Sequence, residues 1–213
     1  MNQSLLDQFG SPEDRVKMAV ISLRNGNGVL ITQGDAADFT GYLIFTPDSL
    51  TQDQTALLIK ECSGFISLCM DEAKAIALGF SQPPGENENT NRFSMDASRN
   101  IGSGVSAGDR LATIQAAAAP NAEAGSISTP GHVFAAVSKS PFSPRAPKIQ
   151  DAVLQLMAWA DLPPLGVCSQ LLTGNGNLAD LPQVIEFGMK QHIPVITMSD
   201  LANRLNREAS RAG

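Results

Sequence analysis

The sequence has little or nothing of several features that define large classes of protein. It contains no basic block, and its 15 Lys and Arg against 21 Asp and Glu give a formal net charge of −6. Nucleic-acid binding usually needs clustered positive charge, so we expect no nucleic-acid partner. No run of about 18 apolar residues occurs, so we expect no membrane partner either.

Cysteine is also scarce. Cys62, Cys69 and Cys168 are scattered through the chain, with no metal-ligand pair among them. A sparse, odd set of this kind is typical of reduced thiols in the cytoplasm. Residues 1–5 lack the basic region and the apolar stretch of a signal peptide. These observations predict a cytoplasmic protein.

What the chain does have is enough apolar sequence for a sizeable core. Hydrophobic residues make up 43%, and the mean hydropathy is −0.03. Helical and strand-like patterns alternate without a repeat or a dividing linker, so we predict a single α/β domain over residues 1–213. The predicted helices are one between the cap Ser11 and Gly26, then 51–62, 71–78, 106–119, 151–160, 183–191 and a last helix capped by Ser199; the predicted strands are 28–32, 41–45, 65–69, 132–138, 165–171 and 193–197.

Two stretches are expected to be irregular. Residues 81–92 are polar, and residues 140–148 contain three prolines. A polar loop as long as the first is more often functional than a mere connection.

Only two histidines are present, His132 and His192. His132 follows Pro130-Gly131 and begins an apolar stretch that we predict to be a strand. An imidazole at such a junction can take and give a proton near neutral pH, or it can simply be held in the turn by backbone partners. His192 is expected at a helix C-terminus, where a cation suits the helix dipole, and has no predicted catalytic role.

Five sets of motifs lie in order along the chain: Met1-Asn2-Gln3-Ser4-Leu5-Leu6 with Phe9-Gly10, Ser63-Gly64 before Leu68-Cys69, Gly104-Val105-Ser106-Ala107-Gly108-Asp109-Arg110, Pro130-Gly131-His132-Val133-Phe134, and Ile185-Glu186-Phe187. Together they resemble the 3,4-dihydroxy-2-butanone 4-phosphate synthase family of the riboflavin pathway, which converts ribulose 5-phosphate into a four-carbon phosphate and formate. The resemblance implies an α/β sandwich, a homodimer, and Mg²⁺ with a sugar phosphate near the dimer interface. It also implies that His132 is catalytic and that no organic cofactor is needed.

The chain departs from the family in its first acidic loop. The family pattern D-D-E-D-R-E-N-E-G-D is replaced by residues 33–42, so the Arg position is Ala37 and the metal-binding Glu is Asp38. Asp38 is the predicted Mg²⁺ ligand, because a carboxylate can still bind this ion. Tyr42 replaces a later acid and is a predicted substrate contact in a drier, less anionic pocket.

Two further positions of the family motif also differ. The R-G-G-H-T-E-A loop corresponds to a stretch one residue longer, in which Arg145 and Lys148 are the predicted phosphate ligands. A catalytic Glu corresponds to Gln170, which keeps the shape of Glu but cannot exchange a proton at neutral pH. Arg110 and Thr113 are predicted either to bind substrate or to serve the helix in which they lie.

Three functions are consistent with this pattern. The first is a diverged enzyme in which His132 performs acid–base chemistry on a small carbonyl or sugar-phosphate compound other than ribulose 5-phosphate. The alternative is a non-catalytic paralogue that binds a metabolite or a partner protein. The third is the retained 3,4-dihydroxy-2-butanone 4-phosphate synthase reaction. We expect the first, because loss of a metal ligand, an Arg and a carboxylate should stop the standard reaction.

Overall fold

Short apolar stretches pair into one mixed sheet of seven strands. The computed structural model describes residues 5–34, 39–80 and 93–212. The strand order is β4-β5-β3-β6-β2-β1-β7. β5 runs parallel to β3, and β1 runs parallel to β7, whereas the other neighbours are antiparallel. The strands are β1 Val29–Gln33, β2 Thr40–Phe45, β3 Ile66–Asp71, β4 Phe93–Ala97, β5 Ile127–Ser138, β6 Leu165–Gln170 and β7 Val195–Thr197.

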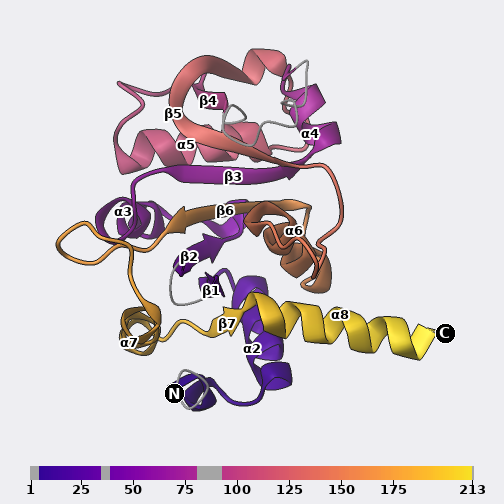
Figure 1. Ribbon diagram of the computed structural model, residues 1–213. Helices are drawn as coiled ribbons and strands as arrows, with labels where there is room; N and C mark the ends of the chain where they lie inside the picture. The colour runs from indigo at the N-terminus through magenta and orange to yellow at the C-terminus, as the bar shows by residue number, and fades with distance from the viewer. Residues whose placement is uncertain (1–4, 35–38, 81–92, 213) are drawn as a thin grey trace.

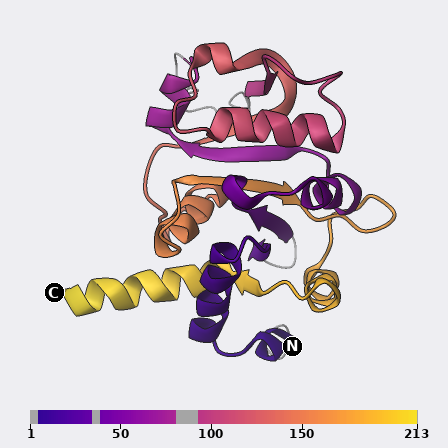
Figure 2. The same cartoon turned by 180° about the vertical axis from the view of Figure 1, so that it is seen from behind.

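Helices cover both faces of this sheet (Figures 1 and 2). Each face has its own apolar core, because successive side chains of a strand point to opposite sides. This arrangement confirms the predicted single-domain α/β sandwich. One core is covered mainly by α3 Gln52–Glu61, α5 Ala107–Ala118 and α7 Leu181–Gln191, with α4 Glu72–Ala77 at its edge, and the other by α2 Pro12–Arg24, α6 Ile149–Trp159 and α8 Met198–Ala212.

Side-chain caps explain why most helices begin where the sequence predicts. Ser11 and Thr51 each accept a hydrogen bond from the third backbone N–H of the following helix, and the residue at that position bonds back. Asp180 caps α7 in the same way. The predicted cap of the last helix was two positions too late: Thr197 and Asp200 form the reciprocal pair, so Ser199 lies inside α8.

The region before His132 differs from the prediction. β4 was not predicted, and Pro130-Gly131 was expected to form a turn before a new strand. β5 in fact begins at Ile127, and its register with β4 shifts between Met95 and Asp96. The Pro-Gly pair therefore lies in an irregularity within a long strand, where the missing N–H of proline breaks no ladder hydrogen bond.

The three cysteines are buried free thiols. Cys69 and Cys168 face each other from β3 and β6, with their Sγ atoms 3.5 Å apart. Burial raises the pKa of the Cys62 thiol to about 12, so this group is not a nucleophile at neutral pH. Within the described ranges, none of the helices has the length and apolar character needed to cross a membrane.

A buried ion pair joins α2 to α8. The Arg15 guanidinium donates to both carboxylate oxygens of Asp200, at 2.6 and 2.8 Å, and also to the backbone oxygen of Gly10 at 2.8 Å. Both side chains are almost fully buried. The charge of Arg15 is therefore compensated inside the protein rather than by water.

We expect Asp200→Asn to destabilise the fold by about 3 kcal/mol or more, because it leaves Arg15 buried without a counter-charge. Asp161→Asn is the matched control, since Asp161 pairs with Arg24 on the surface and its side chain is 84% exposed. That control should cost less than about 1 kcal/mol. Urea unfolding of both variants checks this. Equal losses would show that the Asp200 carboxylate does not compensate a buried charge.

Candidate active site

His132 is held by a carboxylate that lies 36 positions earlier in the chain. Its ring Nδ1 lies 2.9 Å from Asp96 Oδ2, and its backbone N–H donates to Asp96 Oδ1 at 3.0 Å. An ionised Asp96 places the ring proton on Nδ1, so Nε2 is the nitrogen available for proton transfer. The His132 side chain is 39% exposed, whereas that of Asp96 is 13% exposed. The imidazole is thus fixed on one side and open on the other.

Two glycines allow this close packing. Gly131 lies against the β4 backbone, where an added Cβ would overlap the carbonyl carbon of Met95. Gly104 has φ +81°, and an added Cβ would overlap Asp96 Oδ2 and lie 2.6 Å from His132 Nδ1. Neither position has room for a side chain. The glycines are therefore needed to bring the carboxylate and the imidazole together.

The start of α5 supports the same region. Arg110 donates from Nη1 to the Gly64 oxygen at 2.6 Å and from Nε to the Val105 oxygen at 3.1 Å. Partial burial lowers the pKa of the Arg110 guanidinium, and the nearby charge of Asp96 opposes that shift. Thr113 is fully buried, accepting from the Ala97 N–H and donating to the Asp109 oxygen. These bonds give both residues a structural role beside His132.

Gln170 lies at the end of β6, toward the same end of the sheet as His132. His132 precedes Val133, which pairs with Ile66 of β3, while Gln170 follows the stretch of β6 that pairs with β3. One strand therefore separates them, or about 10 Å between their backbones. Gln170 Nε2 donates to Tyr42 Oη at 3.3 Å, so the structure brings these two predicted site residues together.

The loop that carries Arg145 and Lys148 reaches the end of β1. Gln33 Nε2 donates to the backbone oxygen of Pro147 at 3.1 Å. Arg145 and Lys148 are both exposed. The contact places their loop beside the end of β1. Asp38, the predicted Mg²⁺ ligand, lies outside the described residues.

Asp151, in the first turn of α6, is a buried carboxyl near this loop. Ser138 Oγ donates to its Oδ1 at 2.6 Å. Burial raises the pKa of the Asp151 carboxyl, and the Ser138 hydrogen bond and the charge of Lys148 oppose that shift. In the part of the chain that the structure describes, no three His, Cys, Asp or Glu side chains form a group that could hold a metal ion.

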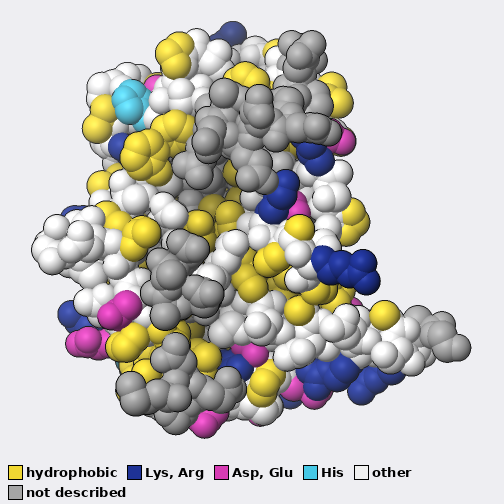
Figure 3. Space-filling view, in the orientation of Figure 1, with side chains coloured by type: hydrophobic (Ala, Val, Ile, Leu, Met, Phe, Trp, Pro, Cys, Tyr) yellow, Lys and Arg dark blue, Asp and Glu magenta, His cyan; other side chains and the backbone are white. Residues whose placement is uncertain are grey.

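Exposed apolar side chains border the imidazole. Phe65 is 55% exposed, and its ring lies 5.2 Å from that of Phe134 between centroids. Val105 is similarly exposed, and Arg110 links its backbone to that of Gly64. Figure 3 shows a histidine exposed among apolar side chains where β4 and β5 lie. Phe65, Phe134 and Val105 are called the apolar patch below.

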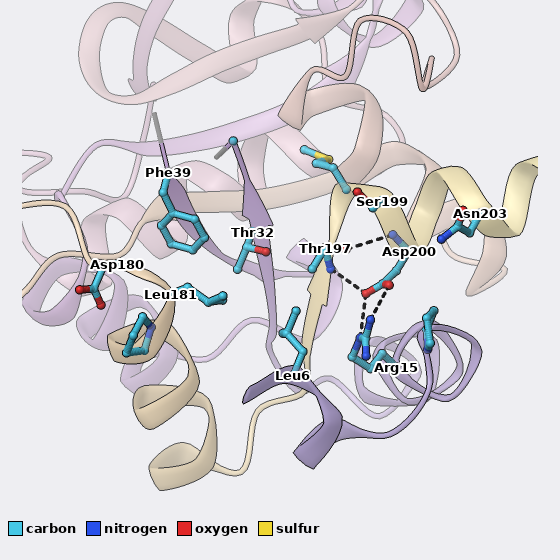
Figure 4. Close-up of a pocket in the computed structure, with 14 residues that line it drawn as sticks. Leu6, Arg15, Thr32, Phe39, Asp180, Leu181, Thr197, Ser199, Asp200 and Asn203 are labelled. Atoms are coloured by element: carbon cyan, nitrogen blue, oxygen red, sulfur yellow. Dashed lines mark hydrogen bonds and ion pairs between the residues drawn. The ribbon is translucent and has the colours of Figure 1, made fainter. Parts of the chain in front are cut away.

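A cavity of about 470 Å³ lies elsewhere, between the N-terminal segment and the starts of α7 and α8 (Figure 4). Its most strongly charged wall is the Arg15–Asp200 pair, whose charges neutralise each other. The other walls combine apolar side chains, including Leu6, Phe39 and Leu181, with polar side chains and the Asp180 carboxylate. The described residues that line this cavity include no histidine, and the Asp180 carboxylate caps α7, so the His132–Asp96 pair is the candidate active site.

Fold and site together define an α/β protein with an acid–base pair at one end of its sheet. Residues 17–204 match the model of the 3,4-dihydroxy-2-butanone 4-phosphate synthase family. A synthase of that name from Desulforamulus reducens is 41% identical over 207 residues, which cover 94% of both chains. One from Tolumonas auensis is 37% identical, with 100% of both chains covered. The chain therefore belongs to this family.

Solved structures agree with the assignment. The synthase of Candida albicans superimposes with a TM-score of 0.80 at 25% identity, covering 89% of this chain and 96% of that chain. A synthase solved in complex with two magnesium ions has a TM-score of 0.81 at 20% identity, covering 90% and 96%, and shows likeness of fold.

These comparisons correct the predicted function. Because several charged residues are replaced, we expected a reaction other than that of the family. Relatives at 34 to 41% identity over nearly the whole chain carry the name of the synthase. This supports the third function considered above, the retained synthase reaction. The replaced side chains were given too much weight against the full-length match.

Asp96 is the residue that sequence reasoning missed. It lies in the short strand β4, which was not predicted, and its partner is distant in the sequence. The available signal was the alternation of Phe93, Met95 and Ala97 with polar residues, which is typical of a half-buried strand. Recognising that strand would have placed a carboxylate where β5 could pair with it.

The raised pKa of Asp151 predicts an unusual dependence of stability on pH. Folding favours the protonated form, so the unfolding free energy should fall as pH rises from the ordinary carboxyl value of 3.8 through the higher folded value. Asp151→Asn removes this loss. The variant should therefore gain relative to the wild type as pH rises to 7.

Asp14→Asn provides the opposite control. Hydrogen bonds from Ser11 lower the pKa of Asp14, so the wild type gains stability from it above pH 3.8 and loses that gain in acid. Urea unfolding between pH 3 and 7 should give curves that diverge in opposite directions for the two variants. Parallel curves would contradict the assignment for Asp151.

Proposed function

We propose that the chain catalyses the reaction for which its relatives are named, the formation of 3,4-dihydroxy-2-butanone 4-phosphate and formate from ribulose 5-phosphate. The single observation that carries this proposal is the His132–Asp96 pair, with Nδ1 held at 2.9 Å and the imidazole partly exposed. The name shared by the full-length relatives supports the choice of substrate.

His132 is the proposed acid–base group. Enolisation of a ketose phosphate requires removal of a proton from carbon next to the carbonyl, and a later step returns a proton. With Nδ1–H donated to Asp96, Nε2 can accept that proton, and the carboxylate stabilises the imidazolium that forms. Positioned acid–base groups of this kind contribute roughly 10² to 10⁴ in rate.

The other predicted residues are assigned to binding. Gln170 and Tyr42 offer an amide and a phenol, which can hydrogen-bond substrate hydroxyls, and Gln170 does not exchange protons at neutral pH. Arg145 and Lys148 are exposed cations on the loop beside β1 and suit the phosphate group.

Mg²⁺ is included in the proposal because one structural neighbour, a synthase of the same name, was solved with two magnesium ions. When bound, the ion would stabilise negative charge on adjacent substrate oxygens. The donors within the described ranges do not by themselves form a metal group, and Asp38 lies outside them. The proton transfer proposed above is therefore assigned to His132 alone.

We also propose that a second copy of this chain covers the apolar patch. Phe65 and Val105 are about half exposed, although both border the partly buried site. Burying large apolar side chains stabilises an interface, and a symmetric dimer is the commonest assembly. In the proposed dimer, the apolar patch of one protomer packs against the same patch of the second protomer, and His132 of each protomer lies beside the interface.

Formate release from ribulose 5-phosphate tests the proposed function. Wild-type protein with Mg²⁺ should release formate faster than a reaction without protein. His132→Asn should lower kcat by roughly 100-fold or more, because an amide cannot exchange protons. His192→Asn is the matched control and should keep wild-type kcat, since His192 is an exposed residue at the end of α7.

Absence of formate release by the wild type would refute the synthase assignment. Equal activity of both histidine variants would refute the role of His132 while leaving the reaction in place. Thermal unfolding of the two variants should be similar to that of the wild type, which separates loss of catalysis from loss of folding.

Sedimentation tests the second copy. Wild-type protein should be a dimer at micromolar concentration, and Phe65→Asp should dissociate it by placing charge in the patch. Met189→Asp is the control, because Met189 is exposed to a similar extent on α7. A monomeric wild type, or dissociation by the control alone, would contradict the proposed interface.

A further inference from the structure

The turn between β4 and α5 lies directly against the bond that joins His132 to Asp96. Gly104 is the point of contact, since the two atoms nearest to an added Cβ are Asp96 Oδ2 and His132 Nδ1. These are the two atoms of the hydrogen bond itself. The position of this turn therefore determines whether protein atoms or water molecules lie against the Asp96–His132 hydrogen bond.

Asp109 holds the turn in place. Its Oδ1 accepts the Gly102 N–H at 3.0 Å, and its Oδ2 accepts the Gly104 N–H at 3.1 Å. Hydrogen bonds from the backbone of Gly102, then from Ser106 and Gly104, lower the pKa of the Asp109 carboxyl, although partial desolvation opposes them. The carboxylate is thus ionised at neutral pH while it binds both N–H groups.

The helix that carries Asp109 is itself fixed to the site. Thr113 joins the Asp109 carbonyl to the Ala97 N–H, one residue after Asp96. Arg110 spans from the Val105 carbonyl to the Gly64 carbonyl. Asp109 therefore links a rigid helix start to the glycine that touches the catalytic pair.

We propose that Asp109 is a positioning residue for His132: by holding Gly102 and Gly104, it keeps the turn packed against Asp96 and keeps the imidazole in its Nδ1–H tautomer. The inference rests on the proposed acid–base role of His132. It goes beyond helix capping, because Ser106 Oγ already accepts the Asp109 N–H as the cap of α5.

Asp109→Asn tests the proposal, because an amide keeps one acceptor oxygen but replaces the other by a donor. Asp14→Asn is the matched control: Asp14 is also the third residue of a capped helix, but α2 packs on β1, β7, α6 and α8. The readouts are the ¹⁵N signals of the His132 imidazole, with His192 as the internal reference, and kcat for formate release.

In Asp109→Asn we expect the His132 signals to move toward a mixture of Nδ1–H and Nε2–H tautomers. We expect kcat to fall roughly tenfold to 100-fold with a smaller change in KM, because the base is misplaced rather than substrate binding lost. Asp14→Asn should leave the tautomer and kcat at wild-type values even if it lowers thermal stability.

A pair of glycine variants provides a test that does not alter Asp109. Gly104→Ala places a methyl group against Asp96 and His132, whereas Gly176→Ala meets nothing within 4 Å at a similar φ of +84°. Both variants carry the backbone strain of an L residue at positive φ. Only Gly104→Ala should shift the His132 signals and lower kcat.

Unchanged His132 signals in Asp109→Asn, or equal shifts in Asp14→Asn, would overturn the proposal. If Asp109→Asn does not fold, the glycine pair decides, and wild-type His132 signals in Gly104→Ala would likewise overturn it. The tautomer measurement needs no substrate. A wild type without formate release would therefore refute the proposed function, while the signals would still decide whether Asp109 positions the imidazole.

Discussion

The two hydrogen bonds between Asp96 and His132 are the interaction on which the candidate active site depends. One carboxylate binds both the ring and the backbone of the histidine. This is possible only because β4 and β5 change register at Asp96 and because Gly131 lets the two backbones approach. The irregularity in β5 is therefore the feature that fixes one side of the His132 imidazole and leaves the other side accessible.

Local chemistry explains why much of the fold could be predicted. Ser11, Thr51 and Asp180 mark helix starts within a few residues, because their side chains bind backbone N–H groups nearby in sequence. β4 was missed because five residues beside a polar stretch carry little periodic signal. The start of β5 was misplaced because a proline inside a strand is tolerated only at an edge or an irregularity, and this irregularity arises where β5 pairs with the distant strand β4.

The site was harder to predict than the fold for the same reason. His132 was recognisable by its motif, but Asp96 and the turn at Gly104 contact it only after distant segments pair. Comparison position by position also overstated the effect of replaced residues such as Gln170, because it does not show which of them contact one another. The structure shows instead that Gln170 is hydrogen-bonded to Tyr42, another replaced position.

The buried pair between Arg15 and Asp200 has a consequence for how the chain matures. The partners are separated by 185 positions, so a ribosome must make nearly the whole sequence before the cation of α2 meets its counter-charge. Until then, α2 cannot bury Arg15 without a large cost in desolvation. The N-terminal helix should thus dock late, and a chain truncated before residue 200 would lack the counter-charge that lets α2 bury Arg15.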